Sequence, residues 1–252
     1  KVFDGSGRPG RQGDIAVKNG KIAALGGRLP TSETKTIHDA DGLWLTPGLL
    51  DIHTHEDLEA ELDPGLPEVV RHGTTSVVVG NCSIGLAFGA QRNERQDPIV
   101  DCFARVENIP KSVLAKTADK AVWTKPKEYL EHLDELPLSA NMAPFLPHSM
   151  LRIEVMGLQD SISRQPTGTE LLRMTGILEE ALEDGYMGMS TDGLPLHFLA
   201  NEPNLEKRIP TQYASFAEYK ALTDVLRKHD RVWQMTPATD NGLLTSRLFM
   251  LS

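Results

Sequence analysis

The chain has 252 residues, 40% of them hydrophobic and 24% charged, and 26 Lys and Arg against 35 Asp and Glu give a formal net charge of −9. This composition is that of an ordinary globular protein and excludes collagen, coiled coil and a disordered chain. The acidic balance, without a basic stripe, argues against nucleic acid or an anionic membrane as the main partner.

The cysteine content and the N-terminal sequence indicate the cellular compartment of the protein. Cys82 and Cys102 are the two cysteines, too few for a disulfide framework, which favours a reducing environment. No apolar run approaches the roughly 20 residues that cross a bilayer, and the N-terminus lacks a signal peptide. We therefore expect a cytoplasmic protein. Because the chain opens at Lys1 inside an apparent strand-and-turn unit, we also expect natural residues to precede it.

Residues 1–46 consist of short apolar pieces separated by turn residues. Asn19-Gly20 is the strongest hairpin signal, between Ile15-Ala-Val and Lys21-Ile-Ala-Ala-Leu. This pattern predicts small antiparallel strands in a separate N-terminal portion.

From residue 47 onward, strand and helix patterns alternate, which indicates βα units and a parallel sheet. Strands are expected at 47–53, 74–80, 140–146, 186–190 and 231–236. A polar, helix-prone stretch fills 83–136 and ends in a helix that starts at Pro126. Further helices are expected at 169–183, closed by Gly185, and at 217–227, capped by Thr211 or Ser215.

The sharpest local motif is His53-Thr54-His55 at the end of an apolar strand. Residues two apart on a strand point to the same side, about 6 to 7 Å apart, so the two imidazoles could share one metal ion. Buried core histidines or a solvated loop are the alternatives. The position favours a metal site, because barrels place their active sites at strand ends.

A family resemblance adds to this interpretation. The segment 46–55 resembles the opening strand of the amidohydrolase superfamily, and 2–7 and 14–25 resemble its N-terminal strands. The segment 73–82 is similar to the D-aminoacylase branch, the N-acyl-D-amino-acid deacylases. The resemblance implies an α/β fold, with a (β/α)8 metal-dependent hydrolase barrel at 47–252, interrupted by a helical insertion at about 83–136. It also implies that 1–46 is part of a small β-sandwich.

The resemblance implies a zinc ion bound by His53, His55 and Cys82. A metal-binding cysteine follows the second barrel strand in this branch, and a thiolate beside imidazoles suits zinc. Tyr186 to Asp192 offer no Lys or Glu at the fourth strand end, so a ligand is needed elsewhere. The alternative for Cys82 is a small buried side chain, which is the favoured role of Cys102.

Three residues are candidates for substrate binding. His148 follows the third strand and would contact a substrate carbonyl or support the metal ligands, with a surface or core role as the alternative. Arg152 could bind a substrate carboxylate, although a structural salt bridge is the more expected role. Asp192, after the fourth strand, is the third candidate, in a segment that lacks the family's tyrosine.

Two departures from the family pattern bear on activity. The fifth strand normally ends in a metal-binding His, whereas this chain has Gln234-Met235-Thr236. His197 and His229 are possible substitutes, but His229 lies late in a predicted helix, where it would interact with the helix dipole.

The barrel pattern also stops after a fifth strand. The family's sixth-strand His and the Asp that acts as general base would lie beyond Ser252, in a longer natural chain or, less favoured, in a partner chain.

The sequence therefore predicts part of a zinc-dependent amidohydrolase, inactive by itself, whose full-length form hydrolyses the amide of a small N-acyl amino acid. Within the superfamily, a cyclic amide is an alternative substrate. A degenerate, non-catalytic member of the fold is the rival interpretation, and the missing fifth-strand His supports it.

Overall fold

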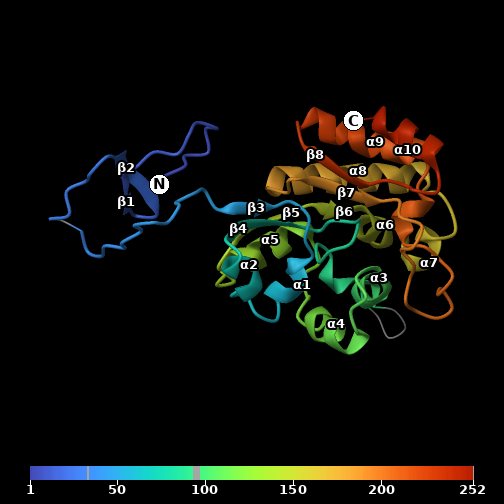
Figure 1. The fold of residues 1–252 in the computed structure, drawn as a ribbon. Coiled ribbons are helices and arrows are strands. Elements are labelled where there is room, and N and C mark those ends of the chain that lie inside the picture. The colour runs from blue at the N-terminus through green and yellow to red at the C-terminus, as the bar shows by residue number, and fades with distance from the viewer. Residues whose placement is uncertain (33, 93–96, 252) are drawn as a thin grey trace. The chain divides into compact units, whose positions relative to one another are not determined.

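The computed structural model describes residues 1–32, 34–92 and 97–251. The chain forms two compact units, Lys1–Leu49 and Leu50–Ser252 (Figure 1).

The first unit contains the expected hairpin. Strands β1 (Asp14–Lys18) and β2 (Lys21–Gly26) pair antiparallel. Asn19 and Gly20 between them have φ values of 53° and 72°, and two consecutive positive φ values are what a type I′ turn requires. The Asn-Gly prediction is therefore confirmed.

The second unit contains two short sheets. Strands β3 (Leu49–Asp51), β4 (Thr74–Val79) and β5 (Asn141–Pro144) form one sheet in that order. Strands β6 (Leu146–Pro147), β7 (Gly188–Asp192) and β8 (Val232–Thr236) form the other. The pairs β4–β5, β6–β7 and β7–β8 are parallel. The α/β class and the five strand positions agree with the sequence prediction.

The strand expected at 140–146 is divided in two. The chain leaves the first sheet at Phe145, whose N–H donates to the Val79 carbonyl at 2.9 Å, while the Pro144 carbonyl accepts from Met187 N at 3.0 Å. Pro144 and Pro147 have no N–H to donate to a sheet. The interruption therefore places β5 beside β4 and β6 beside β7.

The helices of the second unit connect and cover these strands. They are α1 (Glu56–Ala60), α2 (Pro67–Arg71), α3 (Pro98–Val106), α4 (Lys111–Ala118), α5 (Pro126–Glu135), α6 (His148–Met156), α7 (Leu158–Ser161), α8 (Gly168–Asp184), α9 (Phe216–Lys228) and α10 (Gly242–Phe249), with 3-10 turns η1 (Gly89–Gln91) and η2 (Pro210–Tyr213). Helices α8 and α9 lie side by side (Figure 1). In the described ranges, none of the helices has the length and apolar character needed to cross a bilayer.

Capping residues mark the ends of the two longest helices. Helix α8 begins with a capping box between Thr167 and Glu170 and ends at Gly185, whose φ is 127°. Helix α9 is capped by Ser215, whose side chain accepts from Glu218 N. Thr211, the other cap candidate, lies in η2.

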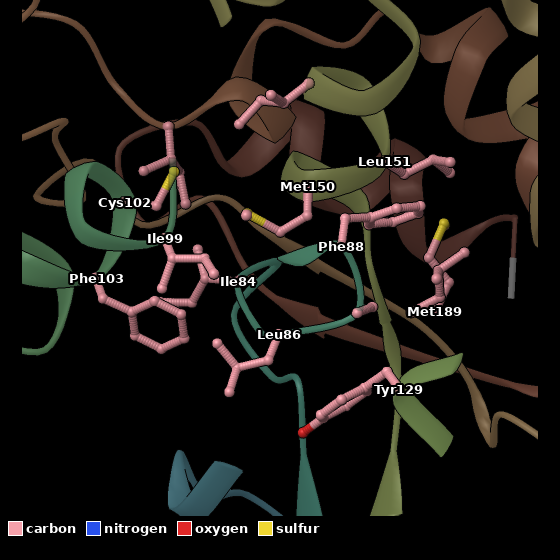
Figure 2. Packing of buried hydrophobic residues seen from close by; sticks show 14 of the residues in the cluster. Ile84, Leu86, Phe88, Ile99, Cys102, Phe103, Tyr129, Met150, Leu151 and Met189 are labelled. Atoms are coloured by element: carbon pink, nitrogen blue, oxygen red, sulfur yellow. The ribbon is translucent and has the colours of Figure 1, made fainter. Parts of the chain in front are cut away.

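The first residues of the stretch expected to be helical, 83–136, are not helical in the structure. Helices α3, α4 and α5 occupy its later part, but residues 83–88 form no helix. Ile84, Leu86 and Phe88 are at most 2% exposed and pack with residues of α3 and α6 in the main core (Figure 2). Burial under two helices, which the local sequence does not encode, makes this segment part of the core.

Candidate metal centre

The segment after β3 is attached to the end of β4. The backbone N–H and the hydroxyl of Thr54 both donate to the Val78 carbonyl, at 3.1 and 3.0 Å. The Asn81 amide donates to the same carbonyl at 2.9 Å and to the Thr54 carbonyl at 3.3 Å. These bonds fix the residue between His53 and His55 and so position both imidazoles.

The turn after β4 orients the side chain of Cys82. Gly80 has a φ of 71°, and a Cβ atom there would lie 2.5 Å from the Phe145 carbonyl oxygen. Cys82 and Ser83 also have positive φ values, of 51° and 67°, a costly conformation for residues other than glycine. The Ser190 hydroxyl stabilises the turn by donating to the Gly80 carbonyl and accepting from Ser83 N.

The structure brings His53, His55 and Cys82 together, although they come from different strand ends. His53 Nε2 lies 3.1 Å from Cys82 Sγ. One ligand atom from each of the three residues lies within 4.8 Å of the others. His55 Nδ1 is buried without a hydrogen-bond partner. Two imidazoles and a thiol at this spacing fit the donor set of zinc.

Glu107 is a fourth charged group at this cluster. It follows α3, and its Oε1 lies 3.0 Å from His55 Nε2. The sequence analysis did not identify it, because a Glu at the end of a polar helix is usually a solvated side chain. No local sequence pattern predicts this contact, because it depends on the packing of α3 against the ends of the strands.

The two histidines have opposite pKa shifts. Burial lowers the pKa of His53, and the neighbouring His55 lowers it further. Burial opposes protonation of His55 too, but hydrogen bonds to Cys82 and Glu107 and the charges of Asp57 and Glu107 together outweigh it and raise the pKa of His55 to about 10. Burial raises the pKa of Glu107, but the hydrogen bond to His55 and the charges of His55, His197 and His53 together lower the pKa below its usual value. A metal ion would have to displace the His55 proton, since it binds the neutral ring.

Asp192 lies at the end of β7 with its side chain buried. Its Oδ1 is 3.0 Å from His197 Nδ1, and its Oδ2 accepts from Gln212 Nε2 at 2.9 Å. His197 is therefore paired with Asp192 and does not belong to the cluster of His53, His55 and Cys82.

Strand β8 contributes neutral groups at the position of the expected fifth-strand ligand. Thr236 Oγ1 lies 3.7 Å from Cys82 Sγ. Gln234, two residues earlier on the strand, points to the same side, and its Oε1 is buried without a hydrogen-bond partner.

His148 and Arg152 lie in a different place from the one expected for substrate contacts. Both side chains are 0% exposed and both pair with Glu218 of α9. His148 Nδ1 also contacts Thr211 Oγ1 at 2.9 Å. A substrate could not reach either group without a rearrangement of α6 and α9, so the geometry favours the structural alternative for both.

His229 and Cys102 have the roles expected of structural residues. His229 caps the C-terminus of α9 and its Nε2 contacts Glu179 at 2.9 Å. Cys102 is buried in the core, where burial raises the pKa of its thiol.

Substituting Gly80 tests the turn that directs Cys82. We expect Gly80→Ala to lower the free energy of unfolding by about 2 kcal/mol or more, because the new Cβ meets a backbone oxygen at a positive φ. Chemical denaturation of the two proteins measures this. Gly176→Ala in α8, where a Cβ meets nothing within 4 Å, is the matched control and should be neutral or slightly stabilising. Equal stability of the Gly80 variant and its parent would contradict the prediction.

Comparison with known proteins gives relatives over most of the chain. A protein of Mycobacterium tuberculosis, described as uncharacterized, is 36% identical over 254 residues, which cover 99% of this chain and 41% of that protein. N-acyl-D-aspartate deacylase of Alcaligenes xylosoxydans xylosoxydans is 36% identical over 190 residues, covering 75% of this chain and 34% of the enzyme. The chain thus spans less than half the length of these relatives. It matches no family model.

A solved structure supports the relationship. N-acyl-D-glutamate deacylase from Bordetella bronchiseptica, complexed with zinc and a phosphonate inhibitor that mimics the tetrahedral intermediate, superposes with a TM-score of 0.76 at 27% identity. The match covers 99% of this chain and 47% of the enzyme. The chain is therefore a relative of the D-aminoacylases and N-acyl-D-glutamate deacylases, a group of amidohydrolases, which confirms the resemblance seen in the sequence.

Proposed function

We propose that this chain supplies part of the active site of a zinc-dependent amidohydrolase that cleaves the amide bond of an N-acyl-D-amino acid. The observation that carries the proposal is the convergence of His53, His55 and Cys82, whose ligand atoms lie within 4.8 Å of one another. The relationship to N-acyl-D-aspartate and N-acyl-D-glutamate deacylases supports the substrate class.

In this proposal His53, His55 and Cys82 hold the zinc ion. Bound zinc supplies Lewis-acid polarisation of a carbonyl and activation of water at neutral pH. The chain's own groups orient these ligands: Thr54 and Asn81 fix the histidine segment, and the turn from Gly80 to Ser83 directs the thiol.

A cavity beside the cluster is the proposed substrate pocket. It has a volume of about 280 Å³, and its lining includes Asp192, Arg208, Gln212 and Thr236. The lining does not include His53, His55 or Cys82, but Thr236, which lines the cavity, lies 3.7 Å from Cys82 Sγ and so connects the pocket to the proposed metal site. Arg208 is 38% exposed and paired with Asp240 at 3.0 Å, and it offers a cation for a substrate carboxylate. Asp192, held by Gln212, would accept a hydrogen bond from the substrate amide.

The remaining architecture is also part of the proposal. The two sheets of the second unit correspond to five strands of a (β/α)8 barrel, and 1–46 corresponds to part of a β-sandwich. The general base and the other strands would come from chain outside this sequence. Two free cysteines fit a reducing compartment such as the cytoplasm.

A non-catalytic relative is the second candidate. Gln234 favours it, because a neutral amide stands where the family resemblance implies an imidazole. Such a protein would keep the fold but hold zinc weakly.

Turnover by the full-length protein tests the proposed function. We expect hydrolysis of N-acetyl-D-aspartate, N-acetyl-D-glutamate or a neutral N-acetyl-D-amino acid, loss of that activity with a chelator, and its return when zinc is added. The matching L enantiomers are the control. Bound zinc without hydrolysis of any of these amides would instead support the non-catalytic candidate.

A further inference from the structure

The turn that carries Cys82 has a backbone conformation that its residues do not favour. The Ile84 N–H donates to the Asn81 carbonyl at 3.0 Å, and the two residues between them, Cys82 and Ser83, have φ values of 51° and 67°. Two positive φ values at the centre of a turn are characteristic of type I′, which prefers Asn, Asp and Gly there. Other residues keep this conformation only where the surrounding structure enforces it.

Hydroxyl groups from other elements enforce the conformation at Ser83. Its N–H donates to the Ser190 hydroxyl of β7 at 3.1 Å. Its own hydroxyl donates to Ser149 Oγ of α6 at 2.8 Å and accepts from the Ser149 N–H at 2.6 Å. All three serines are 0% exposed, so these bonds form away from water, where they are stronger. The turn is therefore held by β7 and α6 rather than by its own sequence.

Ser149 connects the turn to a larger buried network. Its hydroxyl accepts from the Thr211 N–H at 3.1 Å. Thr211 Oγ1 lies 2.9 Å from His148 Nδ1, and His148 Nε2 lies 3.0 Å from Glu218 Oε1. These residues are at most 1% exposed. A buried network whose hydrogen-bonding groups have partners is rigid, so Ser149 is fixed by η2 and α9 as well as by its own helix.

The direction of the Cys82 thiol depends on this turn. Cys82 is the first of the two left-handed residues, and its Sγ lies 3.1 Å from His53 Nε2. A return of its φ to the usual negative range would turn its Cα–Cβ bond in another direction. We propose that the hydroxyls around the turn are positioning groups, which hold Cys82 in the left-handed conformation and direct its thiol at His53. The residues concerned are Ser83, Ser149 and Ser190.

The consequence of this positioning rests on the metal site of the proposed function. A thiol that is already directed at the histidine does not have to be ordered when zinc binds, so the serines should increase the affinity for zinc.

Two substitutions separate positioning of the thiol from a contribution to stability alone. Ser149→Ala removes the hydroxyl that Ser83 contacts and leaves the sequence of the turn unchanged. Ser83→Gly removes the other hydroxyl but relieves the strain, because glycine adopts a positive φ at little cost. Ser161→Ala is the matched control, since Ser161 is also 0% exposed and its hydroxyl donates to the Leu158 carbonyl within α7 at 2.7 Å.

The first measurement is the rate at which iodoacetamide alkylates Cys82 in the zinc-free, full-length protein, followed by mass spectrometry of the peptides. Cys102 is 0% exposed in the core, and its alkylation in the same samples reports unfolding of the whole domain. We expect Ser149→Ala and Ser83→Gly to raise the rate at Cys82 relative to Cys102 at least about 5-fold, because the turn opens locally when a buried hydrogen bond is lost. Ser161→Ala should keep the parent ratio.

The melting temperature of the same proteins distinguishes the two roles. Ser83→Gly should stay close to the parent, because relief of strain offsets the lost hydrogen bond. A faster reaction at Cys82 without a loss of stability is a result that a purely structural serine would not give.

Zinc affinity, measured by competition with a chromophoric chelator, is the second readout. We expect Ser149→Ala and Ser83→Gly to bind zinc at least about 10-fold more weakly than the parent. Ser161→Ala should match the parent.

A ratio of Cys82 to Cys102 alkylation within about 2-fold of the parent in both serine variants would overturn the inference. Unchanged zinc affinity in both, or a parent that binds no zinc, would also overturn it. If Ser149→Ala does not fold, Ser83→Gly decides the question by itself. Neither measurement uses turnover, so a protein that shows the expected changes but cleaves no N-acyl-D-amino acid contradicts only the proposed function.

Discussion

Replacing Cys82 with alanine should remove most of the zinc from the full-length protein and lower amide hydrolysis at least about 100-fold. The thiol is the proposed ligand from the second strand end, and His53 Nε2 lies 3.1 Å from it. Two imidazoles remain in the variant, and a neutral methyl group cannot replace a thiolate. Elemental analysis after gel filtration and initial rates with an N-acyl-D-amino acid measure the two effects.

Cys102→Ala is the matched control for this substitution. It removes the other thiol of the chain, which is buried in the core and lies outside the cluster of ligand atoms. We expect the control to retain zinc and turnover, with only a loss of packing energy. Undiminished zinc in Cys82→Ala would exclude this cysteine as a principal ligand.

Replacing Glu218 with alanine should have the largest effect on stability. The carboxylate pairs with Arg152 and His148, and all three side chains are 0% exposed. Burial alone would raise the pKa of Glu218, but hydrogen bonds from His148 and Arg152 lower it, so the group is charged. Its removal leaves the Arg152 guanidinium buried without its counterion, which costs about 3–5 kcal/mol.

Thermal and chemical denaturation of the variant measure this cost. For a domain of this size, the loss corresponds to a decrease in melting temperature of about 6 to 20 °C. Asp160→Ala is the control, because it breaks the exposed Arg164–Asp160 pair, whose contribution should be below about 1 kcal/mol. Similar decreases in the free energy of unfolding of the two variants would show that the buried Glu218 contacts stabilise the fold no more than an exposed ion pair does.

The elements with strong local signals were predicted correctly. Asn19-Gly20 predicts its hairpin because few other dipeptides adopt two positive φ values. The N-caps and the amphipathic period of helices α8 and α9 lie within continuous segments of the sequence, so they can be recognised locally. The sequence predicted one continuous strand at 140–146, whereas the structure has two, β5 and β6. The break depends on backbone hydrogen bonds to Val79 and Met187, which are distant in sequence.

For the candidate site, the sequence by itself determined which donors are available. It predicted the convergence of His53 and His55 from alternation along a strand, but β3 ends at Asp51 and His55 is the N-cap of α1, so the fold after the strand brings the two rings together. The family resemblance added Cys82. Only the tertiary structure decided that Glu107 meets His55 and that His148 and Arg152 are enclosed with Glu218. The physical reason is that these contacts join residues 52 to 70 positions apart. Their formation depends on how α3, α6 and α9 pack over the strands, which no short segment encodes.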